Sequence, residues 1–179
     1  MADEKLENVR KALTDFPDFP KPGIVFKDIF PILRNPSVFR DLNELILQAV
    51  REVCPDVQCV VGLDSRGFLF GPILALELNI PFVPARKKGK LPGELEQVTY
   101  MLEYGTDCLE IQKSSINKGQ KVLIIDDLLA TGGTLKAACE LVEKIGGEVV
   151  HCLVVVELVA LQGRQKVSKP IKSLIACTD

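Results

Sequence analysis

The stretch VLIIDDLLATGGT, residues 122–134, decides the fold class of this chain. Its first residues, 122–125, are large and aliphatic, which is typical of a short strand that is buried on both faces of a sheet and ends at Ile125. Two aspartates follow, and a turn of small, hydroxyl-bearing and glycine residues then leads into residues 135–145, whose apolar side chains recur at helical spacing. A buried strand, a polar turn and an amphipathic helix in this order indicate one parallel α/β unit.

Other segments repeat this plan. A second apolar strand at residues 57–62 precedes a helix at residues 68–78 and a strand that begins at Phe82. A further buried strand is predicted at residues 149–156. We therefore predict an α/β fold whose central, mostly parallel, twisted sheet is flanked by helices.

Segments outside these units predict smaller elements. Residues 98–104 and 108–112 flank Gly105, which is typical of an antiparallel hairpin or a mobile flap. Asn35 is a preferred helix cap and Pro36 a preferred first helical residue, so together they predict the start of another helix, ahead of the two α/β units in the chain.

Length and charge narrow the class of protein. The 179 residues include 22 Lys+Arg and 24 Asp+Glu, which gives a formal net charge of −2. This length predicts one domain over residues 1–179, and the lack of a basic excess predicts no nucleic-acid partner. The polar start, MADEK, is unlike a secretion signal, and the apolar stretch 149–161 is too short to cross a bilayer. We therefore expect no membrane partner.

Cysteine use points to the cytoplasm. The six cysteines form no CxxC pair, and the chain has one histidine with which to complete a zinc site. Free, buried thiols are usual in a reducing compartment. We expect a cytoplasmic protein without a metal held by its own side chains; a thiol nucleophile would require His151 beside one of the cysteines.

The turn within residues 126–134 has the chemistry of a sugar-phosphate site. In open parallel sheets, ligands bind beyond the carboxyl ends of the strands. Backbone N–H groups at the turn and the helix N-terminus attract an anion, while carboxylates accept hydrogen bonds from ribose hydroxyls and stabilise positive charge on a sugar ring. The alternative is that the two acids only end the strand. The predicted binding residues are Asp126, Asp127, Leu128, Leu129, Ala130, Thr131, Gly132, Gly133 and Thr134.

This stretch is neither a Walker loop, because no GKS or GKT follows, nor the dinucleotide-binding GxGxxG. It resembles the phosphoribosyl pyrophosphate motif of the type I phosphoribosyltransferases. The resemblance covers nearly the whole chain. It is carried further by FPDFP at residues 16–20, GLDSRGF at 62–68, RK at 86–87, KLPG at 90–93 and LEYG at 102–105.

The resemblance implies the type I phosphoribosyltransferase fold, with a small N-terminal hood of residues 1–35 or so and a flexible β-hairpin flap near residues 94–108. It also implies a homodimer, in which Arg86 or Lys87 reaches into the neighbouring subunit's site, and a cis peptide bond at Asp64–Ser65. Arginine suits bidentate phosphate contacts, and lysine supplies a point charge. The alternatives are that residues 62–67 form an ordinary βα loop and that the basic run at residues 86–90 is only a solvated face. The implied pyrophosphate-binding residues are Ser65, Arg66, Arg86, Lys87, Lys90 and Tyr104.

The hood implies a site for the base. An adenine ring needs an apolar slot with an aromatic partner, which Phe26 offers, although hood residues can equally be plain packing residues. Members that act on 6-oxopurines carry an aspartate at the place of Ala130, so alanine there favours adenine. On the flap, Glu103 is the candidate acid/base group and Tyr104 a lid over pyrophosphate; the alternative is a solvated glutamate and a packing tyrosine. The implied adenine-binding residues are Val25, Phe26 and Lys27.

The resemblance implies an enzyme of purine salvage that transfers the 5-phosphoribosyl group from phosphoribosyl pyrophosphate to adenine, giving AMP and pyrophosphate. Glu103, Asp126 and Asp127 are its implied catalytic residues, and Mg²⁺ arrives on the substrate. One alternative is a transferase of the same fold for another base. The other is a regulator that senses phosphoribosyl pyrophosphate and binds DNA, but the Pro-rich residues 1–35 leave no room for a helix-turn-helix.

Overall fold

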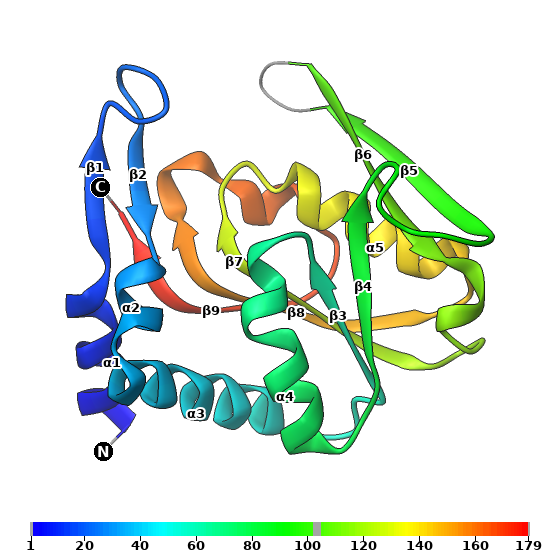
Figure 1. The fold of residues 1–179 in the computed structure, drawn as a ribbon, viewed down its shortest axis with the longest axis horizontal. Helices are drawn as coiled ribbons and strands as arrows, with labels where there is room; N and C mark the ends of the chain where they lie inside the picture. The colour runs from blue at the N-terminus through cyan, green and yellow to red at the C-terminus, as the bar shows by residue number, and fades with distance from the viewer. Residues whose placement is uncertain (1, 102–104, 179) are drawn as a thin grey trace. The chain divides into compact units, whose positions relative to one another are not determined.

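The strand predicted at residues 122–125 lies inside a seven-stranded sheet in the computed structural model of the chain (Figure 1). In spatial order the strands are β5 (Leu95–Met101), β6 (Thr106–Gln112), β4 (Phe82–Lys87), β3 (Cys59–Leu63), β7 (Lys121–Leu129), β8 (Glu148–Leu158) and β9 (Ile171–Cys177). The strands from β4 to β9 in this order run parallel to one another, whereas β5 and β6 add an antiparallel hairpin at one edge. This arrangement confirms the predicted α/β fold with a mostly parallel sheet.

The structure describes residues 2–101 and 105–178. The chain divides into two compact units, Met1–Gln48 and Ala49–Asp179. The single domain over residues 1–179, with its hood and flap, stays a prediction. No described helix has both the length and the apolar character that crossing a membrane requires.

Strand β7 is longer than the sequence predicted. Its predicted end at Ile125 is wrong, because β8 continues to pair with it as far as Leu129, whose partner is Glu157. The two aspartates are therefore part of the strand, and the turn begins at Ala130.

Helices cover both faces of this sheet. Val122 and Ile124 share a buried core with α5 (Gly133–Lys144), which contacts β5, β6, β7 and β8. The next residue, Ile125, faces α4 (Gly71–Leu78), where a Cβ on Gly71 would lie 3.3 Å from its Cγ2 atom. The predicted helix at 68–78 begins late, because the short 3-10 helix η1 (Arg66–Leu69) precedes α4.

The N-terminal unit contains helices and a two-stranded antiparallel sheet. Asn35 Oδ1 accepts hydrogen bonds from the backbone N–H groups of Ser37 (3.1 Å) and Val38 (3.4 Å), which confirms the predicted cap of α3. Helix α3 then continues from this unit into the next. The elements are α1 (Ala2–Ala12), β1 (Thr14–Pro17), β2 (Val25–Asp28), α2 (Phe30–Arg34) and α3 (Pro36–Val53). The remaining short 3-10 helices, all in the second unit, are η2 (Lys113–Ser115), η3 (Val159–Leu161) and η4 (Gly163–Lys166).

Candidate active site

A cavity of ≈ 510 Å³ lies at the carboxyl ends of β3, β4 and β7. It belongs entirely to the second unit and opens where the parallel-sheet rule places a ligand. Its lining joins loops that are far apart in the sequence. The lining residues are Asp64, Ser65, Arg66, Lys87, Tyr100, Asp107, Asp126, Asp127, Leu128, Leu129, Ala130, Thr131, Gly132, Gly133, Thr134 and Leu135.

The turn between β7 and α5 forms one end of this cavity. Gly132 has a φ of 81°, in the left-handed region that glycine adopts without strain, and it caps α5. The first N–H groups of a helix have no partner within the helix, and the helix dipole places positive potential there. Residues 130–134 all line the cavity, so this end suits a phosphate group.

Asp126 and Asp127 form an acidic pair beside that turn. The Asp127 backbone N–H donates to Asp126 Oδ1 at 2.9 Å, and Arg66 Nε lies 3.0 Å from Asp127 Oδ2. Burial raises the pKa of both carboxyls; the charge of Asp127 raises that of Asp126 further, whereas Arg66 opposes the shift at Asp127. Asp127 Oδ2 is buried and receives no hydrogen bond from the described residues, although the Arg66 guanidinium lies beside it as an ion-pair partner. A hydroxyl-bearing ligand would supply that missing donor.

The acidic pair should make the ligand-free protein less stable as pH rises. The pKa of Asp126 lies well above the ordinary 3.8, so at intermediate pH the folded chain binds more protons than the unfolded chain. Stability must then fall through that interval. Thermal unfolding of Asp126→Asn and the unchanged chain should show a difference that grows in favour of the variant as the pH rises above about 4.

A matched variant gives the opposite sign. The hydrogen bond from Lys121 lowers the pKa of the exposed Asp56, so Asp56→Asn should lose stability relative to the unchanged chain as pH rises. A melting-temperature difference for Asp126→Asn that does not change with pH would contradict the raised pKa.

The loop after β3 brings Ser65 and Arg66 to the cavity. Its Asp64–Ser65 peptide bond is cis, as the resemblance implied. A Cβ on Gly67 would lie 2.6 Å from the Ile125 carbonyl oxygen, so only glycine lets this loop pack directly on β7. That close approach places the Arg66 guanidinium against Asp127.

The basic residues at the end of β4 and just after it, 86–90, divide into those that line the cavity and those that do not. Lys87 lines it, whereas Arg86 and Lys90 do not. The Arg86 Nε–H donates to Asp64 Oδ2 at 3.0 Å, and its guanidinium lies 5.7 Å from the Phe68 ring centroid. The backbone N–H of Lys90 donates to a Glu110 carboxylate oxygen at 2.8 Å. Within one chain, Arg86 therefore contacts the loop that follows β3 and does not line the cavity.

Tyr100 and Asp107 line the cavity, but sequence reasoning missed them. Tyr100 on β5 and Asp107 on β6 are direct cross-strand partners, and the Tyr100 hydroxyl donates a hydrogen bond to Asp107 Oδ2 at 3.4 Å. The same oxygen lies 3.0 Å from Lys87 Nζ, and this hydrogen bond raises the pKa of Lys87 against the effect of burial. The predicted hairpin was the sequence signal that could have pointed to these two residues, but it could not show which face of the hairpin lies toward the cavity.

The predicted base-binding residues lie in the N-terminal unit. Phe26 makes an edge-to-face contact with Phe19, with centroids 5.2 Å apart. The buried Lys27 pairs with Asp15 at 2.8 Å, while Val25 is exposed. Their role stays a prediction, as do those of Glu103 and Tyr104, which lie outside the described residues.

Comparison with known proteins places the chain in a family. Residues 31–179 match the family model described as the phosphoribosyl transferase domain. A protein of Drosophila pseudoobscura pseudoobscura named adenine phosphoribosyltransferase is 52% identical over 174 residues, which cover 97% of this chain and 96% of the relative. The chain belongs to the adenine phosphoribosyltransferase family. A human phosphoribosyltransferase of the same name is 48% identical over 177 residues, 98% of each chain.

Solved adenine phosphoribosyltransferases share the fold. The crystal structure from Saccharomyces cerevisiae, in complex with an imino-altritol bisphosphate and adenine, has a TM-score of 0.93 at 45% identity and covers 96% of this chain and 99% of its own. The enzyme from Giardia lamblia, in complex with 9-deazaadenine, has a TM-score of 0.88 at 36% identity over 97% and 98% of the two chains. The type I phosphoribosyltransferase fold implied by the sequence is thereby confirmed.

Proposed function

We propose that this chain transfers the 5-phosphoribosyl group from phosphoribosyl pyrophosphate to adenine and releases AMP and pyrophosphate, as a pentosyltransferase of purine salvage. One observation carries the proposal: a buried acidic pair and a helix N-terminus adjoin in one cavity. That combination fits a sugar with a phosphate on its 5′ carbon. The relatives named for adenine support the choice of base.

The two halves of the cavity would do different work. Residues 130–134 would bind the 5′-phosphate through backbone N–H groups and the hydroxyls of Thr131 and Thr134. Asp126 and Asp127 would accept hydrogen bonds from the ribose hydroxyls. When the bond to pyrophosphate breaks, the sugar ring becomes positive, and these carboxylates stabilise that charge more than they stabilise the neutral ground state.

The basic lining residues of the cavity would hold the leaving group. Arg66 and Lys87 line the cavity with positive charge, and Ser65 adds a hydroxyl. Cations placed where pyrophosphate departs stabilise its growing negative charge. Arg86 and Lys90 do not line the cavity of the single chain, so any pyrophosphate contact from them belongs to the proposed homodimer.

Replacing Lys87 should weaken the binding of phosphoribosyl pyrophosphate. A charge-assisted contact contributes about 1.5–3 kcal/mol, so Lys87→Gln should raise the KM for this substrate about tenfold or more and leave the KM for adenine nearly unchanged. Lys88→Gln is the matched control, because it removes the same charge from an exposed neighbour that does not line the cavity. Equal KM values for the two variants would remove Lys87 from the pyrophosphate site.

The base would be bound by the hood and served by the flap. We propose that Val25, Phe26 and Lys27 form the adenine slot, with the Phe26 ring as stacking partner. Glu103 would exchange the purine proton, and Tyr104 would close over pyrophosphate. These roles rest on the family resemblance of the two segments.

Magnesium fits this acidic pair. Mg²⁺ prefers carboxylate and phosphate oxygens and keeps several water ligands, and Asp127 Oδ2 is a buried acceptor without a donor among the described residues. Asp126 and Asp127 would hold the hydration shell of an ion that arrives on the substrate, where the ion neutralises pyrophosphate charge. No three His, Cys, Asp or Glu residues in the described chain form a metal cluster, and we assign no direct protein ligand.

We propose a cytoplasmic homodimer. The six cysteines are all free thiols, and five of them are buried, which fits a reducing compartment.

The proposal is tested by incubating the protein with phosphoribosyl pyrophosphate, Mg²⁺ and, separately, adenine, hypoxanthine or guanine, and separating the products. We expect AMP from adenine and little nucleotide from the other two bases. Better turnover of a 6-oxopurine would support a transferase for another base. Binding of phosphoribosyl pyrophosphate without any nucleotide would support a sensor.

A further inference from the structure

A second loop packs directly against the turn that would bind phosphate. This supporting loop, residues 159–166, contains η3 and η4. A Cβ on Gly163 would lie 2.1 Å from the Ala130 carbonyl oxygen and 2.8 Å from the Gly132 nitrogen. Conversely, a Cβ on Gly132 would lie 2.2 Å from the Gly163 carbonyl oxygen. The backbone of the supporting loop is in direct contact with the backbone of residues 130–132, with no side chain between them. The position of Gly163 therefore constrains the conformation of this turn.

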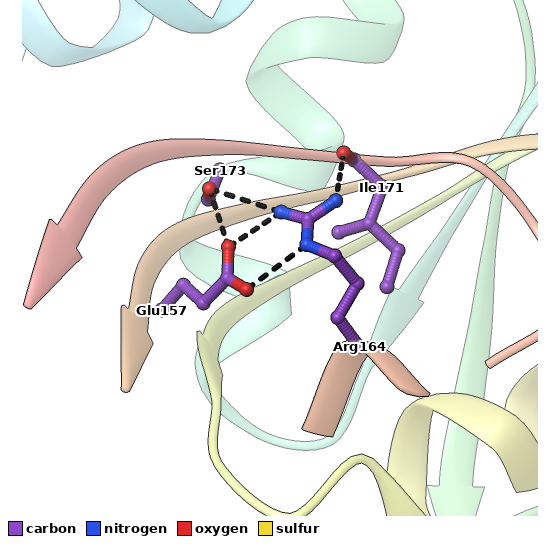
Figure 2. A network of polar contacts seen from close by, with 4 residues as sticks. All are labelled: Glu157, Arg164, Ile171 and Ser173. Carbon is purple, nitrogen blue, oxygen red and sulfur yellow. Dashed lines mark hydrogen bonds and ion pairs between the residues drawn. The ribbon is translucent and has the colours of Figure 1, made fainter. Parts of the chain in front are cut away.

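The supporting loop is anchored by the residue that follows Gly163. The Arg164 guanidinium spans Glu157 with two parallel contacts, Nε to Oε1 at 3.0 Å and Nη2 to Oε2 at 2.5 Å (Figure 2). Its Nη1 donates to the Ile171 carbonyl oxygen at 2.7 Å. Ser173 accepts from Nη2 at 3.3 Å and donates to Glu157 at 2.6 Å. This network ties the loop to β8 and β9, and bidentate pairing fixes its orientation.

The same network reaches the turn from its other end. Glu157 is the β8 partner of Leu129, the last residue of β7 before the turn. The hydrogen bond from Arg164 lowers the pKa of Glu157 although burial opposes the shift, so the carboxylate is charged, and without Arg164 it would keep the Ser173 hydroxyl but lose its positively charged partner. The ion pair therefore joins the strand that enters the turn to the loop that packs on it.

We propose that Glu157 and Arg164 are positioning residues for phosphate binding. Their ion pair fixes the position of the supporting loop. Gly163 of that loop then keeps residues 130–132 in the conformation that binds the 5′-phosphate. Neither residue lines the cavity, so they act only through this backbone contact. The inference rests on the proposed function of the site.

Kinetics and product binding separate this role from plain stabilisation. Arg164→Gln should raise the KM for phosphoribosyl pyrophosphate and the Kd for AMP about ten- to a hundredfold, because small displacements of binding groups have effects of that size. The Kd for adenosine, which lacks the phosphate, should stay within twofold. Arg164→Lys keeps the charge but loses the fork, so it should restore only part of the affinity. Glu157→Gln added to Arg164→Gln should change little further, because the two act as one unit.

The matched control breaks another ion pair of the same unit. Glu143, on α5, is the ion-pair partner of Lys169, and Glu143→Gln should leave the KM for phosphoribosyl pyrophosphate and the Kd for AMP unchanged. If Arg164→Gln does not fold, Ser173→Ala replaces it and should raise the same KM at least twofold.

The outcomes are distinguishable. An unchanged chain that forms no AMP overturns the proposed function. An active unchanged chain whose folded Arg164→Gln variant, or Ser173→Ala in its place, keeps the KM for phosphoribosyl pyrophosphate and the Kd for AMP overturns the positioning role. Loss of AMP and adenosine affinity in equal measure also overturns it, because the phosphate would then not be the group affected.

Discussion

Asp127→Asn should reduce kcat about 100- to 1000-fold, the loss typical when one group that stabilises transition-state charge is removed. The amide keeps the size of the side chain but withdraws the negative charge from beneath the sugar ring. Stability should fall little, because Asp127 is 3% exposed and its burial as a carboxylate is unfavourable, as its raised pKa shows. Initial rates of AMP formation and thermal unfolding of the same preparation provide both measurements.

Asp56→Asn is the matched control for this prediction. Asp56 is an exposed carboxylate at the opposite end of β7, paired with Lys121. It should keep the full kcat. If Asp127→Asn retained turnover within about threefold of the unchanged chain, a difference of less than 1 kcal/mol in activation free energy, the acidic pair would have no part in the chemistry.

Gly132→Ala should raise the KM for phosphoribosyl pyrophosphate about a hundredfold. Two effects combine at this position. A residue with a side chain at a φ of 81° loses about 1–2 kcal/mol, and the new Cβ would lie 2.2 Å from the Gly163 carbonyl oxygen, so the turn must move. The KM for adenine should change much less, because the displaced groups are those that bind phosphate. Rates at varied concentrations of each substrate test this directly.

Gly119→Ala separates the two effects. Gly119 has a similar φ of 75°, but a Cβ there would meet nothing within 4 Å. It should lower the melting temperature through backbone strain and leave both KM values unchanged. A normal KM in folded Gly132→Ala would show that the turn tolerates displacement and would weaken its assignment to the phosphate.

The predicted site residues that the structure brings together are mostly those that are contiguous in sequence. Residues 126–134 line the cavity as one run, because a strand, its turn and the following helix form a local unit whose geometry is set by neighbours in the chain. Ser65 and Arg66 join them for the same reason, at the end of the adjacent parallel strand. Tyr100 and Asp107 could not be found in this way, because the face a hairpin turns to a site depends on what it packs against.

The sequence by itself determined the α/β class, the family and the two strand-to-helix turns, since hydrophobic periodicity, glycine placement and contiguous motifs act over a few residues. Only the tertiary structure decided that β7 runs on to Leu129, because a strand ends where its neighbour stops pairing with it. It also decided that Arg86 turns to Asp64 while Lys87 faces the cavity. The same holds for the contact between Gly163 and the turn at Gly132, because long-range packing brings these two loops to within backbone contact.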